Sequence, residues 1–375
     1  MTAEDSIRRY QKAQSDLVLQ SVDYPLSVFS MMQKQKNLDL NPDFQRRSRW
    51  DVLRRSQLIE SFLLNVPVPP VYLAEESVGQ YSVIDGKQRL SAGVDFINNE
   101  YALEGLEHFT ELNGKKFKEL PSALQSAISS RPYLRVIILL QQSDNELKYE
   151  VFRRLNRGGM RLNDQELRNS MFRGPLNDLI YDLASNQFLR KRLKISEKKP
   201  TISAAYKEML DAEYVTRFLA MREFFAESNR SDEYSGNLTE TFNQFLIENK
   251  NADADRLAYL RERFERAIDY AEKIFGDFAF CKPNGNSSFR NQSVVPMYEA
   301  EMLALDRLTD DEADVLTKKS DIVKQELING FEQDSALGVN FSGFKTAVTV
   351  STNNKSRFLA RNKIMYDFFK AVAAL

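Results

Sequence analysis

The sequence predicts an α+β protein, with an α/β domain over residues 1–174 and a mostly α-helical domain over residues 175–375. Three observations predict this fold class. A strand, a tight turn and a helix follow one another around Asp85-Gly86. An apolar run from Tyr133 to Leu140 is typical of a central strand. After Pro175, strand patterns almost vanish and long amphipathic stretches follow.

The first predicted helix begins near Arg49 and ends before Pro67. Ser48, with an acidic residue three positions later, is a capping box. Apolar residues follow at helical spacing, namely Ile59, Phe62, Leu63 and Val66. Pro67, Pro69 and Pro70 then require an extended backbone.

The next segments predict a hairpin and a second helix. Val71–Leu73 and Tyr81–Ile84 are two strands separated by polar residues around Gly79. Asp85-Gly86 ends the second strand, and a helix with a buried stripe of Leu90, Val94 and Ile97 closes at Asn98-Asn99. Residues 100–130 are irregular and polar, with a short helix that starts at Pro121.

Helices account for most of the chain after the strand at 133–140. One helix ends at Gly158-Gly159, where a left-handed C-cap is easy, and another begins at Asn163 with Glu166 completing a capping box. The longest amphipathic stretches are Ile202–Phe225, Ala254–Phe275, Asp311–Ile328 and Ser356–Ala373. Predicted loops interrupt them at Glu227–Gly236, Lys282–Asn291 and Gln333–Gly343.

Histidine and cysteine are almost absent. His108 and Cys281 are the one His and the one Cys of the chain. Zinc fingers and two-histidine metal sites are therefore excluded, and so is a disulfide within the chain. No apolar run approaches the length of a membrane span, and the N-terminus lacks the pattern of a signal peptide. We expect a cytoplasmic protein without a membrane segment.

The net charge of −1 conceals two unlike halves. Residues 1–200 carry a basic excess and residues 201–375 an acidic one, and the basic residues are densest between 151 and 200. Such an excess attracts phosphate, and candidate DNA contacts are Arg153, Arg154, Arg157, Arg161 and Arg168. The alternative is a solvated helix face whose counter-charges lie elsewhere in the fold.

The first chemical motif is Asp85-Gly86-Lys87-Gln88-Arg89, which follows a strand and opens a helix. The first-turn N–H groups, the helix dipole, Lys87 and Arg89 can converge there on a phosphate. Asp85 can hold a divalent cation or accept a proton from an attacking water. The alternative is an Asp-Gly turn that only caps a helix.

A second motif lies in Phe44–Trp50, where three arginines stand beside the only Trp. Arginine beside an aromatic ring can bind phosphate or stack on a base. Trp50 can equally fill the core while the arginines lie on the surface.

A third motif is the Asn156-Arg157-Gly158-Gly159 turn between two capped helices. Such a turn exposes backbone amides and can close over a ligand, or it can simply connect the helices.

Five blocks, in this order, resemble the N-terminal domain of the GmrSD type IV restriction enzymes, known as the domain of unknown function 262. The likeness is strong over about residues 20–175 and departs from the usual Asp-Gly-Gln-Gln-Arg motif at Lys87. The blocks are Gln45-Arg46 with Trp50, Leu58-Ile59-Glu60-Ser61, Pro67-Val68-Pro69, Ile84-Asp85-Gly86-Lys87-Gln88-Arg89-Leu90, and Phe152-Arg153-Arg154-Leu155-Asn156-Arg157-Gly158-Gly159 followed by Leu162 and Glu166-Leu167.

The resemblance implies a ParB/sulfiredoxin-like N-terminal fold that binds a nucleoside triphosphate (NTP) with Mg²⁺ and acts in bacterial defence against modified or phage DNA. Asp85, Gln88 and Arg89 would be the catalytic residues, and Asp85 the metal ligand. The remaining nucleotide-binding residues would be Gln45, Arg46, Gly86, Lys87, Asn156, Gly158 and Gly159. Partners would be DNA, a nuclease or another defence protein in trans, or a second copy of the chain.

In the complete restriction enzymes, a separate HNH-type domain cuts DNA, and residues 176–375 contain no His for that chemistry. A Walker A motif is also absent from the sequence. The leading hypothesis is therefore an NTP-binding defence module, with NTP hydrolysis to be tested. The alternatives are a non-catalytic DNA-binding protein with a vestigial nucleotide site, and a nuclease built from carboxylates such as Glu60 and Asp85.

Overall fold

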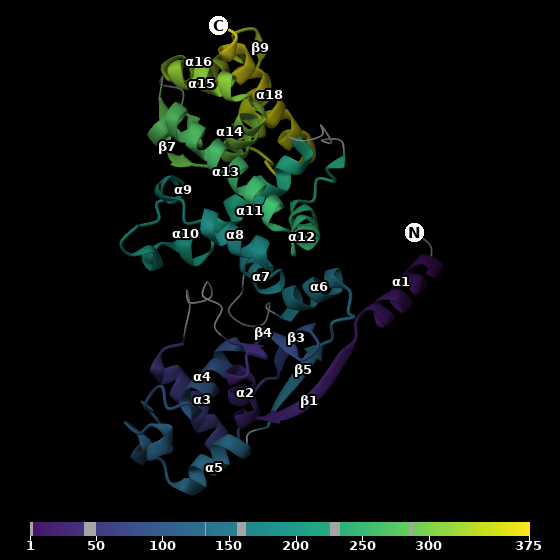
Figure 1. The fold of residues 1–375 in the computed structure, drawn as a ribbon, viewed down its shortest axis with the longest axis vertical. Helices are drawn as coiled ribbons and strands as arrows, with labels where there is room; N and C mark the ends of the chain where they lie inside the picture. Colours follow the sequence, from purple (N-terminus) through teal and green to yellow (C-terminus); the bar gives the residue numbers. More distant parts are fainter. Residues whose placement is uncertain (1–2, 41–49, 132, 156–162, 226–232, 285–287) are drawn as a thin grey trace. The chain divides into compact units, whose positions relative to one another are not determined.

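A computed structural model describes residues 3–40, 50–131, 133–155, 163–225, 233–284 and 288–375. The chain forms two compact units, which we call unit 1 (Met1–Asn163) and unit 2 (Asp164–Leu375). Unit 1 combines a sheet with helices, whereas helices dominate unit 2 (Figure 1). The predicted α+β class is thereby confirmed.

Unit 1 contains a five-stranded mixed sheet with the order β1-β5-β3-β4-β2. β5 lies inside the sheet, antiparallel to β1 and parallel to β3, while β3 and β4 form the antiparallel hairpin. The strands are β1 (Leu19–Pro25), β2 (Leu38–Asp39), β3 (Val71–Ser77), β4 (Gln80–Asp85) and β5 (Tyr133–Leu139).

Helices of unit 1 share one apolar core with the sheet. Alternate residues of β3 and β5, such as Leu73 and Val136, are buried in it together with Phe29, Ile59 and Leu90 from three helices. The helices are α1 (Ala3–Asp16), α2 (Leu26–Lys34), α3 (Val52–Leu63), α4 (Lys87–Ile97), α5 (Ser122–Ser130) and α6 (Asn145–Leu155), with 3₁₀ turns at Thr110–Leu112 and Phe117–Glu119.

The start of α3 differs from the prediction. Asp51, three residues after the predicted Ser48, is the N-cap, and its carboxylate accepts the N–H of Arg54 at 2.8 Å. Ser48 lies outside the described residues. The hairpin, the interior strand, α4 and α5 confirm the predicted order of elements, whereas α1, β1 and α2 were not predicted.

Unit 2 is built mainly from helices, with two small two-stranded sheets. Its helices are α7 (Asp164–Met171), α8 (Pro175–Leu183), α9 (Gln187–Arg192), α10 (Ala204–Lys207), α11 (Leu210–Phe225), α12 (Leu238–Glu248), α13 (Ala254–Phe275), α14 (Val295–Arg307), α15 (Asp310–Lys318), α16 (Ser320–Gln333), α17 (Phe344–Ala347) and α18 (Lys355–Ala373), with 3₁₀ turns at Pro200–Ile202 and Gly276–Phe278. Its strands are β6 (Cys281–Pro283), β7 (Phe289–Ser293), β8 (Ser335–Ala336) and β9 (Val339–Asn340).

Several predicted boundaries in unit 2 need correction. The stretch 202–225 is divided into α10 and α11 by Met209, which has a left-handed backbone with φ 56°. The stretch 311–328 is likewise divided between α15 and α16. The predicted loop at 282–291 contains parts of the β6–β7 hairpin. Only α13 has the predicted bounds at both ends.

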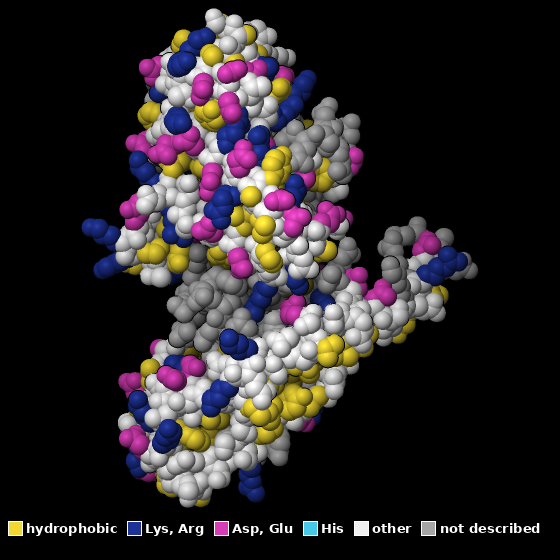
Figure 2. Space-filling model, viewed as in Figure 1, with side chains coloured by type: hydrophobic (Ala, Val, Ile, Leu, Met, Phe, Trp, Pro, Cys, Tyr) yellow, Lys and Arg dark blue, Asp and Glu magenta, His cyan; other side chains and the backbone are white. Residues whose placement is uncertain are grey.

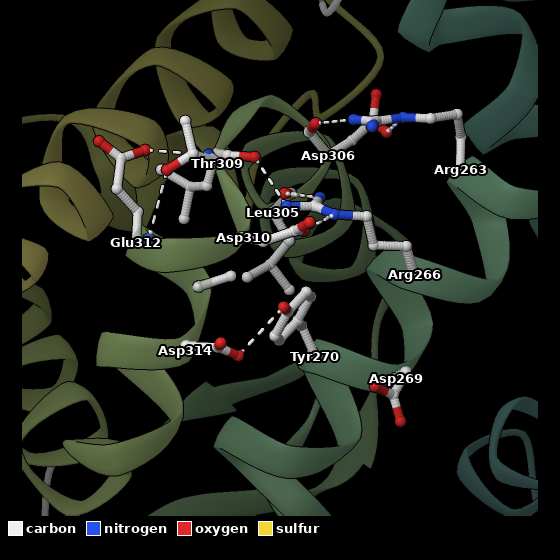
Figure 3. A network of polar contacts seen from close by, with 12 residues as sticks. Arg263, Arg266, Asp269, Tyr270, Leu305, Asp306, Thr309, Asp310, Glu312 and Asp314 are labelled. Atoms are coloured by element: carbon white, nitrogen blue, oxygen red, sulfur yellow. Dashed lines mark hydrogen bonds and ion pairs between the residues drawn. The ribbon is translucent and has the colours of Figure 1, made fainter.

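Arginines of α13 hold the end of α14 and the start of α15 (Figure 3). Arg263 contacts the buried carboxylate of Asp306 at 2.7 Å. Arg266 donates to the carbonyls of Leu305 and Leu308 and pairs with Asp310 at 2.6 Å. The last carbonyls of α14 therefore receive side-chain donors, and this polar network is structural.

Among the helices of the described residues, none combines the length and apolar character needed to cross a membrane.

Candidate functional site

The Asp85–Arg89 turn joins the end of β4 to the start of α4. Gly86 is the N-cap of α4 and has a left-handed backbone, with φ 92°. The first N–H groups of a helix have no acceptor within it, and the helix dipole makes this end positive. The positive end of α4 therefore lies in the turn where the sequence predicted a phosphate site.

Glycine is required at position 86 for two reasons. Residues with a side chain rarely adopt the positive φ found at Gly86. A Cβ atom there would also lie 2.9 Å from Cγ2 of Val71 and 3.0 Å from Nη2 of Arg89. The bare backbone at Gly86 thus allows Arg89 and the first strand of the hairpin to approach the turn closely.

Arg89 folds back over the turn that precedes it. Its Nη2 atom donates to Oδ2 of Asp85 at 2.6 Å and to the carbonyl of Pro70 at 3.2 Å. Its Nε is buried and has no hydrogen-bond partner among the described residues. The Asp85 side chain retains 37 % of its exposure and that of Arg89 17 %. A carboxylate and a guanidinium therefore neutralise one another at a partly exposed helix N-terminus.

Gln88 links this turn to the start of α3. Its Oε1 accepts the backbone N–H of Trp50 at 3.1 Å, immediately before Asp51, which caps α3. The guanidinium of Arg54 lies 4.8 Å from the centre of the Trp50 ring. The N-terminal ends of α3 and α4 are consequently neighbours, which the sequence did not predict.

A second polar link joins the two helices farther along. Arg55 of α3 pairs with Asp95 of α4 at 2.5 Å, and its guanidinium lies 4.0 Å from the centre of the Tyr101 ring. Burial raises the pKa of Tyr101 well above its ordinary value. This cluster fixes α3 against α4.

The carboxylate of Glu60 binds backbone N–H groups and has a structural role. Its buried carboxylate accepts the backbone N–H groups of Glu107, His108 and Phe109 at 2.7–3.3 Å. Burial alone would raise its pKa, but these three donors outweigh burial and lower the pKa of Glu60. Glu60 therefore anchors the irregular 100–120 segment and is not placed with Asp85.

Several predicted site residues lie outside the described residues. They are Gln45, Arg46, Asn156, Arg157, Gly158, Gly159 and Arg161. Lys87 is half-buried in the first turn of α4.

Two of the predicted DNA contacts, Arg153 and Arg154, lie on α6 and share one carboxylate. Arg153 Nε is 2.8 Å and Arg154 Nε 2.6 Å from oxygens of Glu150, and the Arg154 side chain is 72 % exposed. Each guanidinium retains further donors for a phosphate, although Glu150 offsets part of their charge.

Arg168 is buried, in contrast to its predicted place on a DNA-binding surface. It is 3 % exposed, its guanidinium donates to Gln165 and Asn243, both at 3.3 Å, and it lies over the ring of Phe242. These contacts correct the prediction by giving Arg168 a structural role in unit 2. On the visible face of unit 2, basic and acidic side chains are interspersed (Figure 2).

Metal-binding clusters of the usual kind are absent from the described part of the chain, where no three His, Cys, Asp or Glu side chains are grouped to hold an ion.

Comparison with known families gives a match over part of the chain. Residues 28–173 match the family model described as GmrSD restriction endonuclease, N-terminal domain. The matched range contains α3, the hairpin, the Asp85–Arg89 turn and α4, and it confirms the resemblance that the sequence motifs indicated. Searches of curated proteins and of solved structures gave no match.

Proposed function

Since residues 28–173 are a GmrSD restriction endonuclease N-terminal domain, we propose that this protein is the nucleotide-binding module of a restriction-like anti-phage system. It binds a nucleoside triphosphate with Mg²⁺ at the Asp85–Arg89 turn. Nucleotide binding is then coupled to recognition of DNA or of a partner protein.

The observation that carries this proposal is the Asp85–Arg89 ion pair at the N-terminus of α4. A magnesium–triphosphate group brings one cation and several anionic oxygens. Asp85 suits the cation, and Arg89 with the first turn of α4 suits the phosphate oxygens. Binding of the ligand would therefore replace the Asp85–Arg89 pair with two new pairs, Asp85 with the cation and Arg89 with the phosphate oxygens.

The residues present fit Mg²⁺, which prefers one or two carboxylates together with phosphate oxygens and water. When bound, the ion would neutralise charge on the phosphates. Asp85 would hold it, Arg89 would orient a phosphate oxygen, and the bare backbone of Gly86 would allow close approach of that oxygen to α4.

DNA recognition and cleavage require further surfaces. Arg153 and Arg154 are the described candidates for a DNA phosphate contact. His108 is the single His of this sequence, and its backbone N–H is bonded to Glu60. We therefore assign any cleavage by a histidine-dependent nuclease to residues other than those of this sequence.

The experiment mixes purified full-length protein with each of the four ribonucleoside triphosphates and Mg²⁺, with and without DNA. Nucleotide binding and phosphate release are measured for the wild type and for an Asp85→Ala/Arg89→Ala variant. An Asp23→Ala/Arg135→Ala variant is the matched control, because it removes an exposed Asp–Arg pair between β1 and β5.

Nucleotide binding that is lost only in the Asp85→Ala/Arg89→Ala variant supports the proposal. Salt-sensitive DNA binding without nucleotide affinity would favour the DNA-binding alternative. DNA cleavage by the chain alone would favour the nuclease alternative.

A further inference from the structure

The contact between Gln88 and Trp50 joins two segments that are 38 residues apart in the sequence. The Trp50 N–H precedes α3, so it lies outside the hydrogen-bond ladder of that helix. Gln88 Oε1 supplies its acceptor at 3.1 Å. A side chain in the first turn of α4 thus satisfies a backbone donor at the entrance to α3.

A further contact, between α3 and α4 themselves, is the Arg55–Asp95 pair. Arg55 lies five residues after Trp50 and pairs at 2.5 Å with Asp95, which lies seven residues after Gln88. Both helices therefore start at the same end of unit 1, and the Gln88 contact lies at that end. Asp51 completes the arrangement by capping α3 through the N–H of Arg54.

We propose that Gln88 is a positioning residue, which holds Trp50 and the start of α3 beside the Asp85–Arg89 turn. Its amide oxygen is occupied by a backbone donor, and its side chain is therefore directed toward α3. This inference rests on the proposed function, because it makes the placement of Trp50 part of the nucleotide site. Asp85 and Arg89 would contact the ligand, whereas Gln88 would act through Trp50.

Trp50 is the only Trp in the chain, so its fluorescence reports this contact directly in the full-length protein. The test compares Gln88→Met, which keeps the side-chain length without the acceptor, with Gln88→Glu, which keeps an acceptor. Gln57→Met is the control, because Gln57 is exposed on α3. Emission spectra and acrylamide quenching are recorded without nucleotide.

We expect Gln88→Met to shift the Trp50 emission to the red and to increase its quenching. The Gln88→Glu and Gln57→Met variants should match the wild type. Unchanged emission and quenching in Gln88→Met would overturn the proposal. So would an equal change in Gln88→Glu, because the acceptor would then not be the feature that matters.

Nucleotide measurements separate positioning from direct chemistry. Loss of one hydrogen bond should weaken nucleotide binding by about fivefold in Gln88→Met, with kcat retained if phosphate is released. A large fall in kcat with unchanged KM would overturn the positioning role and make Gln88 a catalytic residue. A wild type that binds no nucleotide would refute the proposed function, while the quenching data would still decide whether Gln88 holds Trp50.

Discussion

Nη2 of Arg89 lies 2.6 Å from Oδ2 of Asp85, within the turn that begins α4. The same nitrogen donates to the carbonyl of Pro70, at the end of the proline-rich segment that precedes β3. The guanidinium thus links the Ile84–Leu90 block of the family likeness to Pro70, which directly follows the Pro67-Val68-Pro69 block. A ligand that competes for this pair would contact the end of β4, the start of α4 and the approach to β3.

Asp85→Asn should reduce the effect of Mg²⁺ on nucleotide affinity. The substitution preserves the shape of the side chain but removes the charge that would hold the cation. We expect Mg²⁺ to strengthen binding by about tenfold or more in the wild type and by much less in the variant. Calorimetric titrations with and without Mg²⁺ measure the difference. Asp23→Asn, at an exposed pair, should behave like the wild type.

Gly86→Ala should destabilise unit 1 more than Gly79→Ala. Both glycines have positive φ, so each substitution costs about 1–2 kcal/mol from the backbone alone. A Cβ at position 79 meets no atom within 4 Å, whereas one at 86 lies 2.9 Å from Val71 Cγ2. The crowding should add about 1–3 kcal/mol. Urea unfolding followed by Trp50 fluorescence reports unit 1, and equal losses in the two variants would contradict this packing.

Glu60→Gln should destabilise unit 1 at neutral pH by about 1–3 kcal/mol, because three backbone donors lose a charged acceptor. The folded-state pKa of Glu60 is lowered, so its contribution to stability is complete above the unfolded pKa of about 4.3. It is lost as the pH falls through the folded-state pKa. The difference in the free energy of unfolding between the wild type and Glu60→Gln should therefore become smaller as the pH falls. Urea unfolding at several pH values measures this difference. Glu100→Gln, at an exposed position, is the control.

Glu301 should make the stability of unit 2 depend on pH in the opposite direction to that of Glu60 in unit 1. Its side chain is fully buried, Oε2 accepts the N–H of Phe280 at 2.9 Å, and Oε1 has no partner among the described residues. Burial raises its pKa well above the ordinary range. Its contribution to stability is therefore complete below the unfolded pKa and is lost as the pH rises toward the folded-state pKa.

Glu301→Gln resembles the protonated side chain and should make the stability of unit 2 less dependent on pH, with a gain at neutral pH. Urea unfolding followed by far-UV circular dichroism between pH 5 and 8 measures this difference, with the exposed Glu262→Gln as control. A loss of stability at neutral pH would contradict the account of Glu301 as a neutral buried acid.

Local patterns predicted much of the fold around the turn. The hairpin and the strand–turn–helix order at Asp85-Gly86 depend on neighbouring residues, and the structure has both. Of the predicted apolar stripe of α4, Leu90 and Val94 are buried and Ile97 is partly buried. Strand β1 was not predicted, because its own residues carry little strand pattern. It is an edge strand with mostly exposed residues, and its partner β5 lies more than 100 residues later in the sequence. Pairing of this kind leaves little pattern in the strand itself.

The site could be predicted only in part for the same reason. The motif located Asp85 and Arg89, but only the fold shows that the two side chains pair and that Gln88 contacts Trp50. The density of basic residues around Arg168 predicted an exposed DNA-binding surface. Arg168 is instead buried and donates to Asn243, which is 75 residues away in the sequence. Charge density along a sequence does not reveal which guanidinium has an internal partner.

The most direct measurement is the dissociation constant of each ribonucleoside triphosphate with Mg²⁺, determined by calorimetry for the wild type, Arg89→Ala and Arg135→Ala. Arg89 would donate charge-assisted hydrogen bonds to phosphate, so we predict that Arg89→Ala weakens binding by roughly 10- to 100-fold while Arg135→Ala leaves it unchanged. Equal affinities in all three proteins, or no affinity in the wild type, would contradict a nucleotide site at the Asp85–Arg89 turn.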